Sequence, residues 1–218
     1  MEDNLVKSDV VFNSDNLLCP LVIDLDGTLI RTDLLYQSMF FFIKQRPLHF
    51  LLPIIWLSKG KSHLKTKLAQ RISIDVSVLP YNLAVIALIE SEKAKNRQII
   101  LATASHKIYA DQIADHLNLF DRVLATDEHF NLSSHTKKDC LVAEYGEGGF
   151  DYAGNSHADI PVWASAAKAY LINPEKGVVK RAAKKGNVDR VIKSPHRPFG
   201  LWLRALNLQQ KNGHIKKP

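Results

Sequence analysis

A short apolar run that ends in a carboxylate, at residues 19–24, constrains the fold of this chain more than any other feature. Its sequence, CPLVID, is typical of a buried strand in a parallel sheet. Comparable runs follow at residues 98–103, 122–126, 150–153 and 169–172, separated by segments with helical patterns. Because strands that alternate with helices build parallel sheets covered on both faces, we predict an α/β fold with a Rossmann-like parallel sheet flanked by helices.

The segment between the first two predicted strands is too long for a simple crossover. Over residues 33–96 the apolar residues recur with a helical pattern, interrupted by prolines at 47, 53 and 80. Connections inside compact domains are usually far shorter, so we interpret this stretch as an inserted helical cap. The resulting division has four parts: a disordered lead-in at 1–18, a core at 19–32 and 97–174, the cap insertion at 33–96, and a basic C-terminal extension at 175–218.

The charge is distributed unevenly along the 218 residues. Residues 175–218 hold 12 lysines and arginines against two acidic residues, whereas residues 1–174 hold 17 against 20. A basic tail of this kind favours an anionic partner, such as phospholipid headgroups, nucleic acid or an acidic protein. Of these we expect an anionic membrane surface and not nucleic acid. The alternative is a solvated, partly disordered tail.

The chain carries no pattern typical of export. Cys19 and Cys140 lie far apart, so we expect neither a disulfide framework nor a zinc site. We therefore expect the protein in a reducing compartment. The first 16 residues lack the charged-then-apolar pattern of a signal peptide. The apolar segment 47–57 is about half as long as a spanning helix needs to be. We expect a cytoplasmic protein in which this segment packs within the cap or rests on the inner face of a membrane.

Asp24 and Asp26 end the first predicted strand and begin a turn. Ligands of open α/β sheets bind beyond the carboxyl ends of the strands, so both carboxylates belong at such a site. They can converge on one hard divalent cation, and Mg²⁺ suits a site that also binds phosphate. One carboxylate can attack phosphorus to form an aspartyl-phosphate, while the other transfers protons. Gly27 permits a tight turn and Thr28 can hold the loop, although an ordinary turn or a calcium loop would also fit this short motif.

The segment VIDLDGTLIRTD, at residues 22–33, resembles the first signature of the haloacid dehalogenase superfamily. Further signatures follow in order, so that the resemblance covers about residues 20–174. It implies a nucleophilic Asp24 and an acid/base Asp26. It also implies that Gly27 and Thr28 take part in substrate binding.

The second signature of that superfamily is a Ser or Thr at the end of the next strand, which Thr103 matches. A hydroxyl beside a helix N-terminus is placed to bind a phosphoryl oxygen, and we include the adjacent Ala104 in the substrate-binding segment. The alternative reading of this region is a helix cap. We expect Ser105 as that cap, before a helix over 107–117.

The third signature is a lysine at the start of a helix, which neutralises the nucleophile and the transferring phosphate. Lys137 and Lys138 both qualify, in a segment with a helical pattern at 136–145. Lys137 lies four residues before Leu141 and hence on the same helix face. We therefore prefer Lys137 as the catalytic lysine and assign Lys138 to substrate binding.

The fourth signature reads Gly-Asp-x-x-x-Asp, and this chain has GNSHAD at residues 154–159. Asn155 stands where the first acid is expected, and Asp159 matches the second. The resemblance implies a Mg²⁺ site formed by Asp24, Asp26, Asn155 and Asp159. An amide oxygen can bind the ion but adds no negative charge, so we expect weaker Mg²⁺ binding than with two acids.

A finer resemblance points to the haloacid dehalogenase domain found N-terminal to UbiA-like membrane prenyltransferases. It rests on three segments: RTDLLYQS, LATASHKIYADQIADHLNLFD and GFDYAGNSHADIPVW. The chain ends about where the membrane domain of such fusions would begin, so we expect a stand-alone relative or a shortened form. This likeness suggests a polyprenyl or phosphoribosyl phosphate as substrate.

Together these features predict a Mg²⁺-dependent phosphohydrolase that acts through an aspartyl-phosphate on a small phosphorylated molecule. A phosphotransferase would use the same residues with a different acceptor. The alternative from another class is a catalytically weak accessory module. Such a module would dock on a membrane or a prenyltransferase through its basic tail.

Overall fold

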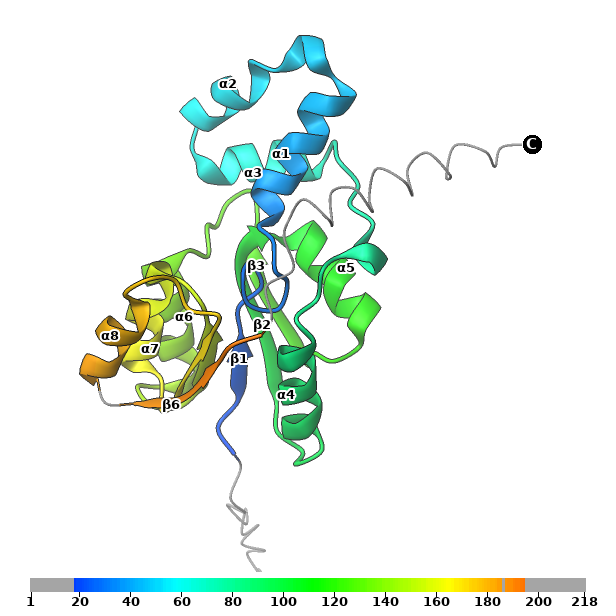
Figure 1. Ribbon diagram of the computed structural model, residues 1–218. Helices are drawn as coiled ribbons and strands as arrows, with labels where there is room; N and C mark the ends of the chain where they lie inside the picture. The colour runs from blue at the N-terminus through cyan, green and yellow to red at the C-terminus, as the bar shows by residue number, and fades with distance from the viewer. Residues whose placement is uncertain (1–17, 186, 195–218) are drawn as a thin grey trace, which may run out of the picture.

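The computed structural model describes residues 18–185 and 187–194, and its centre is one sheet of six parallel strands (Figure 1). The strand order is β3-β2-β1-β4-β5-β6. The predicted α/β class is confirmed. The strands are β1 Leu21–Ile23, β2 Ile99–His106, β3 Arg122–Thr126, β4 Asp151–Gly154, β5 Ala169–Ile172 and β6 Val188–Ile192.

Helices cover both faces of the sheet, as Figure 1 shows. Successive side chains of a strand point to opposite faces, and β1 illustrates this because it is buried on both. Leu21 and Ile23 join one apolar cluster, whereas Val22 joins the other. The first cluster includes residues of α4 Leu83–Lys93 and α5 Lys107–Leu117, and the second includes residues of α6 Ser134–Tyr145, α7 Ile160–Ser165 and α8 Val178–Ala182.

The sixth strand lies inside the stretch that the sequence assigned to a basic extension. β6 pairs with β5 in parallel, with Ile172 opposite Ile192, and so extends the sheet to residue 192. Its middle residues are exposed because it is an edge strand. The expected extension at 175–218 is therefore wrong for its first part, which belongs to the sheet domain. Residues 195–218, with most of the predicted membrane-binding tail, and residues 1–17 of the lead-in lie outside the described residues.

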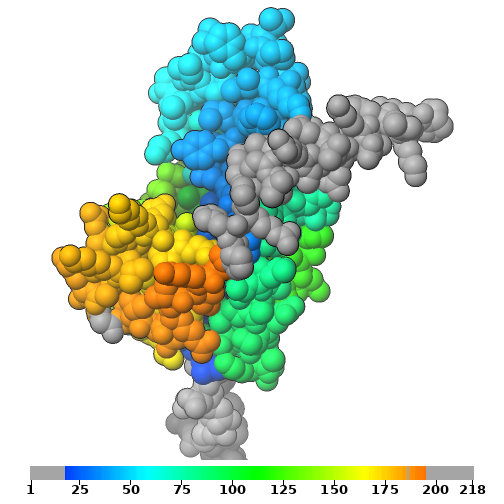
Figure 2. Space-filling model, in the orientation of Figure 1, coloured from blue at the N-terminus to red at the C-terminus, as the bar shows by residue number. Residues whose placement is uncertain are grey.

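The predicted helical insertion divides into two parts in space. Three α-helices lie beyond one end of the sheet and form a lobe, the cap (Figures 1 and 2). By contrast α4, which the sequence also placed in the insertion, packs along the sheet through Val85, Leu88 and Ile89. The cap elements are α1 Leu34–Gln45, η1 Pro47–His49, α2 Leu52–Ser58 and α3 Lys61–Ala69.

The apolar core of the cap is continuous with the apolar cluster on one face of the sheet. The ring of Trp56 in α2 packs edge-on against Phe42 in α1, with centroids 5.0 Å apart. Arg71 covers the same Trp56 ring at 4.9 Å, an arrangement in which the cation is attracted to the aromatic face. Leu64 and Leu68 of α3 complete this core. Of the helices in the described ranges, none combines the length and the apolar character needed to cross a bilayer.

A buried cation holds the amino end of the sheet, opposite the cap. The guanidinium of Arg97 lies 3.0 Å from Glu92 and also contacts Asp151, and its Nε donates to the Cys19 carbonyl at 2.7 Å. These partners come from the end of α4, from β4 and from the residues before β1. Arg97 therefore ties three segments of the core together at one point.

Candidate active site

The candidate site lies between β1 and β4, where the strand order of the sheet reverses. The strands β2 and β3 follow on one side of β1, and β4, β5 and β6 follow on the other side, which makes β1/β4 the topological switch point. Ligands of such sheets bind in the crevice beyond the carboxyl ends at this point. Asp24 follows β1 directly, and its N–H donates to the Ala153 carbonyl of β4 at 2.9 Å. Asn155 follows β4, so the two side chains flank the switch point.

The turn after Asp24 is built around Gly27, which has a φ of +77°. Glycine adopts this left-handed conformation without the strain that a Cβ imposes. The position is also crowded, because a Cβ on Gly27 would lie 2.2 Å from Nδ2 of Asn155. The Leu29 N–H closes the turn by donating to the Asp24 carbonyl at 3.2 Å. Glycine is thus required here both for its backbone angle and for its lack of a side chain.

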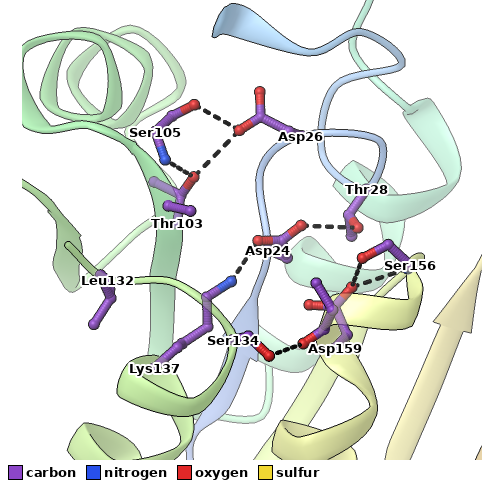
Figure 3. A network of polar contacts seen from close by, with 12 residues as sticks. Asp24, Asp26, Thr28, Thr103, Ser105, Leu132, Ser134, Lys137, Ser156 and Asp159 are labelled. Carbon is purple, nitrogen blue, oxygen red and sulfur yellow. Dashed lines mark hydrogen bonds and ion pairs between the residues drawn. The ribbon is translucent and has the colours of Figure 1, made fainter. Parts of the chain in front are cut away.

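Asp24 and Lys137 form a buried ion pair at the centre of the site (Figure 3). Nζ of Lys137, which comes from the first turn of α6, lies 2.6 Å from Oδ1 of Asp24. Burial raises the pKa of Asp24 to about 7, and Lys137 opposes this rise. Burial by itself lowers the pKa of Lys137, but Asp24 and Asp159 outweigh it, so that this pKa is raised. The lysine is therefore held as a cation against the carboxylate.

The neighbouring Lys138 lies outside this constellation. Its Nζ pairs with Asp139 at 2.8 Å, on the outer side of α6. Residues next to each other in a helix point about 100° apart, which explains why only Lys137 reaches Asp24. The structure thus does not bring Lys138 to the site, where the sequence had placed it.

Asp26 turns away from Asp24 toward the second strand and the cap. Its Oδ2 accepts a hydrogen bond from Oγ of Ser105 at 2.6 Å, and its Oδ1 accepts from the Leu34 N–H at 2.8 Å. Thr103 Oγ1 lies 3.5 Å from the same Oδ2. Burial raises the pKa of Asp26 to about 6, and Asp33 adds to the rise while these hydrogen bonds oppose it. The expected convergence of both carboxylates on one point is therefore not what the structure shows.

Ser105 is not the helix cap that the sequence suggested. The N-cap of α5 is His106, whose Nδ1 accepts from the Ile108 N–H at 3.3 Å. β2 runs on to His106 and carries Ser105 to Asp26 instead. The Ser105 N–H also donates to Thr103 Oγ1 at 2.9 Å. The hydroxyls of Thr103 and Ser105 thus stand together at the end of β2 (Figure 3).

Thr28 lies between the nucleophile candidate and Asn155. Its hydroxyl is 3.5 Å from Oδ2 of Asp24 and 3.3 Å from Oδ1 of Asn155, and it has one proton to donate. Two acceptor oxygens, one from a carboxylate and one from an amide, therefore face the same point. Oxygen ligands grouped in this way suit a hard cation.

Asp159 is occupied in holding the loop after β4. Its Oδ2 accepts from the N–H groups of Asn155 and Ser156, at 3.0 and 2.9 Å, and from the Ser156 hydroxyl at 3.0 Å. Its Oδ1 accepts from the hydroxyl of Tyr152 at 2.7 Å. With four hydrogen bonds, both oxygens are engaged by the protein itself.

The donor set fits Mg²⁺ with few protein ligands. Across residues 18–185 and 187–194, no three His, Cys, Asp or Glu side chains are grouped as a metal site. Asp24 and Asn155 nevertheless present neighbouring oxygens, and Mg²⁺ commonly binds through one or two carboxylates and completes its shell with water and phosphate. The residues present therefore accommodate the ion. Of the two side chains that face it, only Asp24 can carry a negative charge.

The cap contributes a lysine to the rim of the site. Nζ of Lys65, in α3, donates to the Ala104 carbonyl at 2.6 Å, and burial lowers its pKa while Asp26 and Asp33 oppose the shift. A small pocket lies at this junction, lined by Leu34, Leu35, Ser38, Lys65, Ser105, His106 and Tyr109. Ala104 thus meets the cap through its backbone, and a cation stands next to the pocket.

The sequence reasoning missed three polar residues of this region. Tyr152 links Lys137 to Asp159, since its hydroxyl accepts from Lys137 at 2.9 Å and donates to Asp159. It lies within a buried strand, where a tyrosine reads as an ordinary core residue. Lys65 gave no signal because its segment is rich in lysine. Ser105 had a signal, its spacing of two from Thr103 on one strand face, but was read as a cap.

A doubly wound parallel sheet below a helical cap, with a carboxylate and a lysine paired at its switch point, places the chain among the capped doubly wound α/β proteins. The family follows directly, because the model of the haloacid dehalogenase-like hydrolases matches residues 21–163. The chain belongs to this family.

One protein of known sequence resembles most of the chain. It is 34% identical over 198 residues to the uncharacterized protein y4nM of Sinorhizobium fredii (strain NBRC 101917 / NGR234), and the match covers 90% of this chain. The chain spans only 38% of the length of that relative.

Solved structures share the fold at low sequence identity. A HAD family hydrolase from Salmonella enterica subsp. enterica serovar Typhi has a TM-score of 0.56 at 11% identity, over 84% of this chain and 69% of its own. A phosphoserine phosphatase in its apo form has a TM-score of 0.55 at 13% identity, over 84% of this chain and 96% of its own. At these identities the likeness concerns the fold.

Proposed function

We propose that this chain is a Mg²⁺-dependent phosphohydrolase in which Asp24 carries the phosphoryl group during turnover. One observation carries the proposal: a carboxylate beyond the central strand is paired with a buried lysine at 2.6 Å. A carboxylate attacks phosphorus readily only where positive charge offsets the anionic phosphate. Lys137 supplies that charge at Oδ1 of Asp24, which leaves Oδ2 of the same carboxylate as the attacking oxygen.

The reaction has two steps. In the first, a carboxylate oxygen of Asp24 attacks phosphorus, the bond from phosphorus to the leaving oxygen breaks, and Asp26 gives its proton to that oxygen. In the second, a water molecule attacks phosphorus, its proton passes to Asp26, and the bond to Asp24 breaks to release inorganic phosphate. Proton transfer of this kind contributes roughly 10²–10⁴-fold to rate. Asp26 ends each cycle in the protonation state in which it began.

The other residues bind and orient in this scheme. Thr103 and Ser105 offer hydroxyls at the end of β2 for phosphoryl oxygens, and Thr28 steadies the turn through Asp24. Lys65 stands at the rim, where a cation favours an anionic substrate. Asp24, Asn155 and the backbone of the turn would hold Mg²⁺, with Asp159 positioning Asn155 from behind. When bound, the ion supplies positive charge against the phosphate.

For the substrate class we propose a small phosphorylated molecule. The pocket between cap and core is small, and Ser38, Lys65, Ser105 and His106 are among the residues that line it. Among the structures of similar fold are phosphoserine phosphatases, one with substrate bound. A polyprenyl or phosphoribosyl phosphate, and with it the likeness to UbiA-associated domains, stays a prediction. So does the cytoplasmic location at the inner face of a membrane.

The proposal is tested with a panel of phosphomonoesters and polyprenyl phosphates, with Mg²⁺ and with a chelator. We expect phosphate release that requires the ion and that disappears in Asp24→Asn, because an amide does not attack phosphorus. Asp139→Asn removes an exposed carboxylate of α6 and serves as the matched control. Intact mass spectrometry should show one added phosphoryl group in the wild type and none in Asp24→Asn. Undiminished turnover in Asp24→Asn would refute the mechanism.

A second candidate is an accessory module with weak catalysis, favoured by Asn155 at the position of an acid. With Asp159 engaged by four hydrogen bonds, Asp24 is the main anionic group left to face a cation. The same panel separates the two functions. If the chain is an accessory module, it should release no phosphate above background from any substrate, even at saturating Mg²⁺ and with the fold intact.

A further inference from the structure

The outer surface of the cap is apolar and carries no negative charge. Of the fifteen exposed large apolar side chains in the described part of the chain, nine lie between residues 36 and 57. They are Tyr36, Phe40, Ile43, Leu48, Phe50, Leu51, Ile54, Ile55 and Leu57, and we call them the cap face. Scattered exposed apolar residues are normal, but a concentration of this kind marks an interaction site.

The cap face follows from helices that are apolar on two sides. In α1, Phe41 and Phe42 are buried in the cap core, yet Tyr36, Phe40 and Ile43 point to solvent at helical spacing. In α2, Trp56 is buried while Ile54 is 64% exposed. The tip between the helices carries Leu48, which is 92% exposed. Internal packing therefore explains only one side of each helix.

Charge decides which partner fits this face. Residues 34–74, which contain the whole cap, hold seven lysines and arginines and no aspartate or glutamate. Two such caps would repel each other, which argues against a dimer formed through this face. Exposed aliphatic groups bordered by basic residues are instead the pattern of segments that lie at the surface of an anionic bilayer. The exposed Lys59 and Lys61, just beyond α2, lie on this border.

The position of the cap permits contact with a flat surface. In Figures 1 and 2 the cap forms one end of the described molecule. Within the cap, α2 lies on the side away from the sheet (Figure 1). A planar partner can therefore meet α2 without touching the core helices. We propose that the cap face docks on an anionic lipid bilayer, with the aliphatic side chains entering the interface and the basic residues at the headgroups. This docking requires neither the basic tail nor phosphatase activity.

The test is co-sedimentation of the full chain with vesicles of phosphatidylcholine alone or mixed with phosphatidylglycerol. The wild type should pellet with the anionic vesicles. The variant Leu48→Ser/Ile54→Ser/Ile55→Ser should lose roughly tenfold in vesicle affinity for each side chain, given the free energy of burying such groups. The matched control Leu83→Ser/Ile108→Ser/Val179→Ser removes as many exposed apolar groups from the core and should bind as the wild type does.

A charge series completes the design. Lys59→Gln/Lys61→Gln should weaken binding by roughly fivefold for each lysine, since a basic residue near an anionic surface contributes about 1 kcal/mol. The control Lys138→Gln/Lys168→Gln removes the same charge from the core and should have little effect. Circular dichroism verifies that each variant is folded. Absence of pelleting by the wild type, or equal pelleting of the cap and control variants, would overturn the proposal; the first result would point to an acidic protein, and the second to the basic tail.

Discussion

At the residue scale, the site depends on which of two adjacent lysines faces inward. Lys137 is buried against Asp24, whereas Lys138 pairs with Asp139 on the outer side of the helix. Their chemistry is the same, so the difference lies entirely in helix geometry. A comparison of the two positions therefore isolates the contribution of location from that of charge.

We predict that Lys137→Met lowers kcat by roughly 10²–10³-fold, as removal of a preorganised electrostatic group does. Lys138→Met, the matched control, should stay within a factor of about two of the wild type, because an exposed pair contributes little. Steady-state kinetics measures both, and thermal melts show whether the fold survives. Equal losses in the two variants would mean that the ion pair with Asp24 has no role in turnover.

Asn155 is the residue at which charge and metal affinity should be linked. We predict that Asn155→Asp lowers the Mg²⁺ concentration needed for half-maximal activity, because it adds a negative charge beside Asp24 at a position already facing it. A Mg²⁺ titration of phosphate release measures the effect. Asn96→Asp, at an exposed position after α4 and far from the site, adds the same charge and controls for net charge. An unchanged Mg²⁺ requirement would remove Asn155 from the metal site.

At the element scale, the amino end of the sheet is held by Arg97 and its two carboxylates. Removing one partner of a buried ion pair leaves an uncompensated charge and costs about 3–5 kcal/mol. We therefore expect Arg97→Met to lower the free energy of unfolding by about that amount, measured by urea denaturation. Lys107→Met, which breaks an exposed pair with Asp111, is the control and should cost about 0–1 kcal/mol.

The same network gives the stability a dependence on pH. Burial by itself raises the pKa of Glu92, but hydrogen bonds from Lys95 and Arg97 outweigh it, so that the pKa is lowered from 4.5. A carboxylate with a lowered pKa stabilises the fold above its unfolded value and loses this contribution as the pH falls below about 4.5. Arg97→Met should flatten this part of the profile, which denaturation at a series of pH values below 5 would show.

The elements that the sequence predicted well are those with an unambiguous periodicity. The strand at 169–172 and the helix at 107–117 have the expected bounds. β6 was missed because an edge strand needs few apolar residues, and Asp189 and Arg190 in its middle resemble a solvated tail. α4 was assigned to the cap because a helix that covers a sheet has the same periodicity as a helix that covers another helix. Only the tertiary structure distinguishes these partners.

For the candidate site, the sequence likewise predicted some features and not others. The sequence indicated Asp24, Lys137 and Asn155 because their motifs lie at strand ends and a helix start, where the fold brings them together. It did not indicate where Asp26 points, since that depends on Ser105 and on the first N–H of α1. Side-chain direction within a turn is set by the surrounding structure and has no periodicity to reveal it.

At the scale of the whole molecule, the sheet extends further toward the C-terminus than the charge pattern implied. A chain shortened after residue 174 would lose β6 and α8, whose Val178 and Ala182 are buried against the core. We predict that it unfolds well below the melting temperature of the full chain, whereas a chain shortened after residue 194 melts close to it. The shorter deletion is therefore the proper test of the basic tail on anionic vesicles. Similar melting of both chains would show that β6 adds no stability.

One hydrogen bond links the first helix of the cap to the turn that follows β1. The N–H of Leu34, the first residue of α1, donates to Oδ1 of Asp26, and the same helix carries Tyr36, Phe40 and Ile43 of the cap face. α1 therefore joins the cap face directly to Asp26, the side chain that we propose transfers protons. A shift of α1 large enough to break this hydrogen bond would leave Asp26 with one donor fewer to oppose protonation.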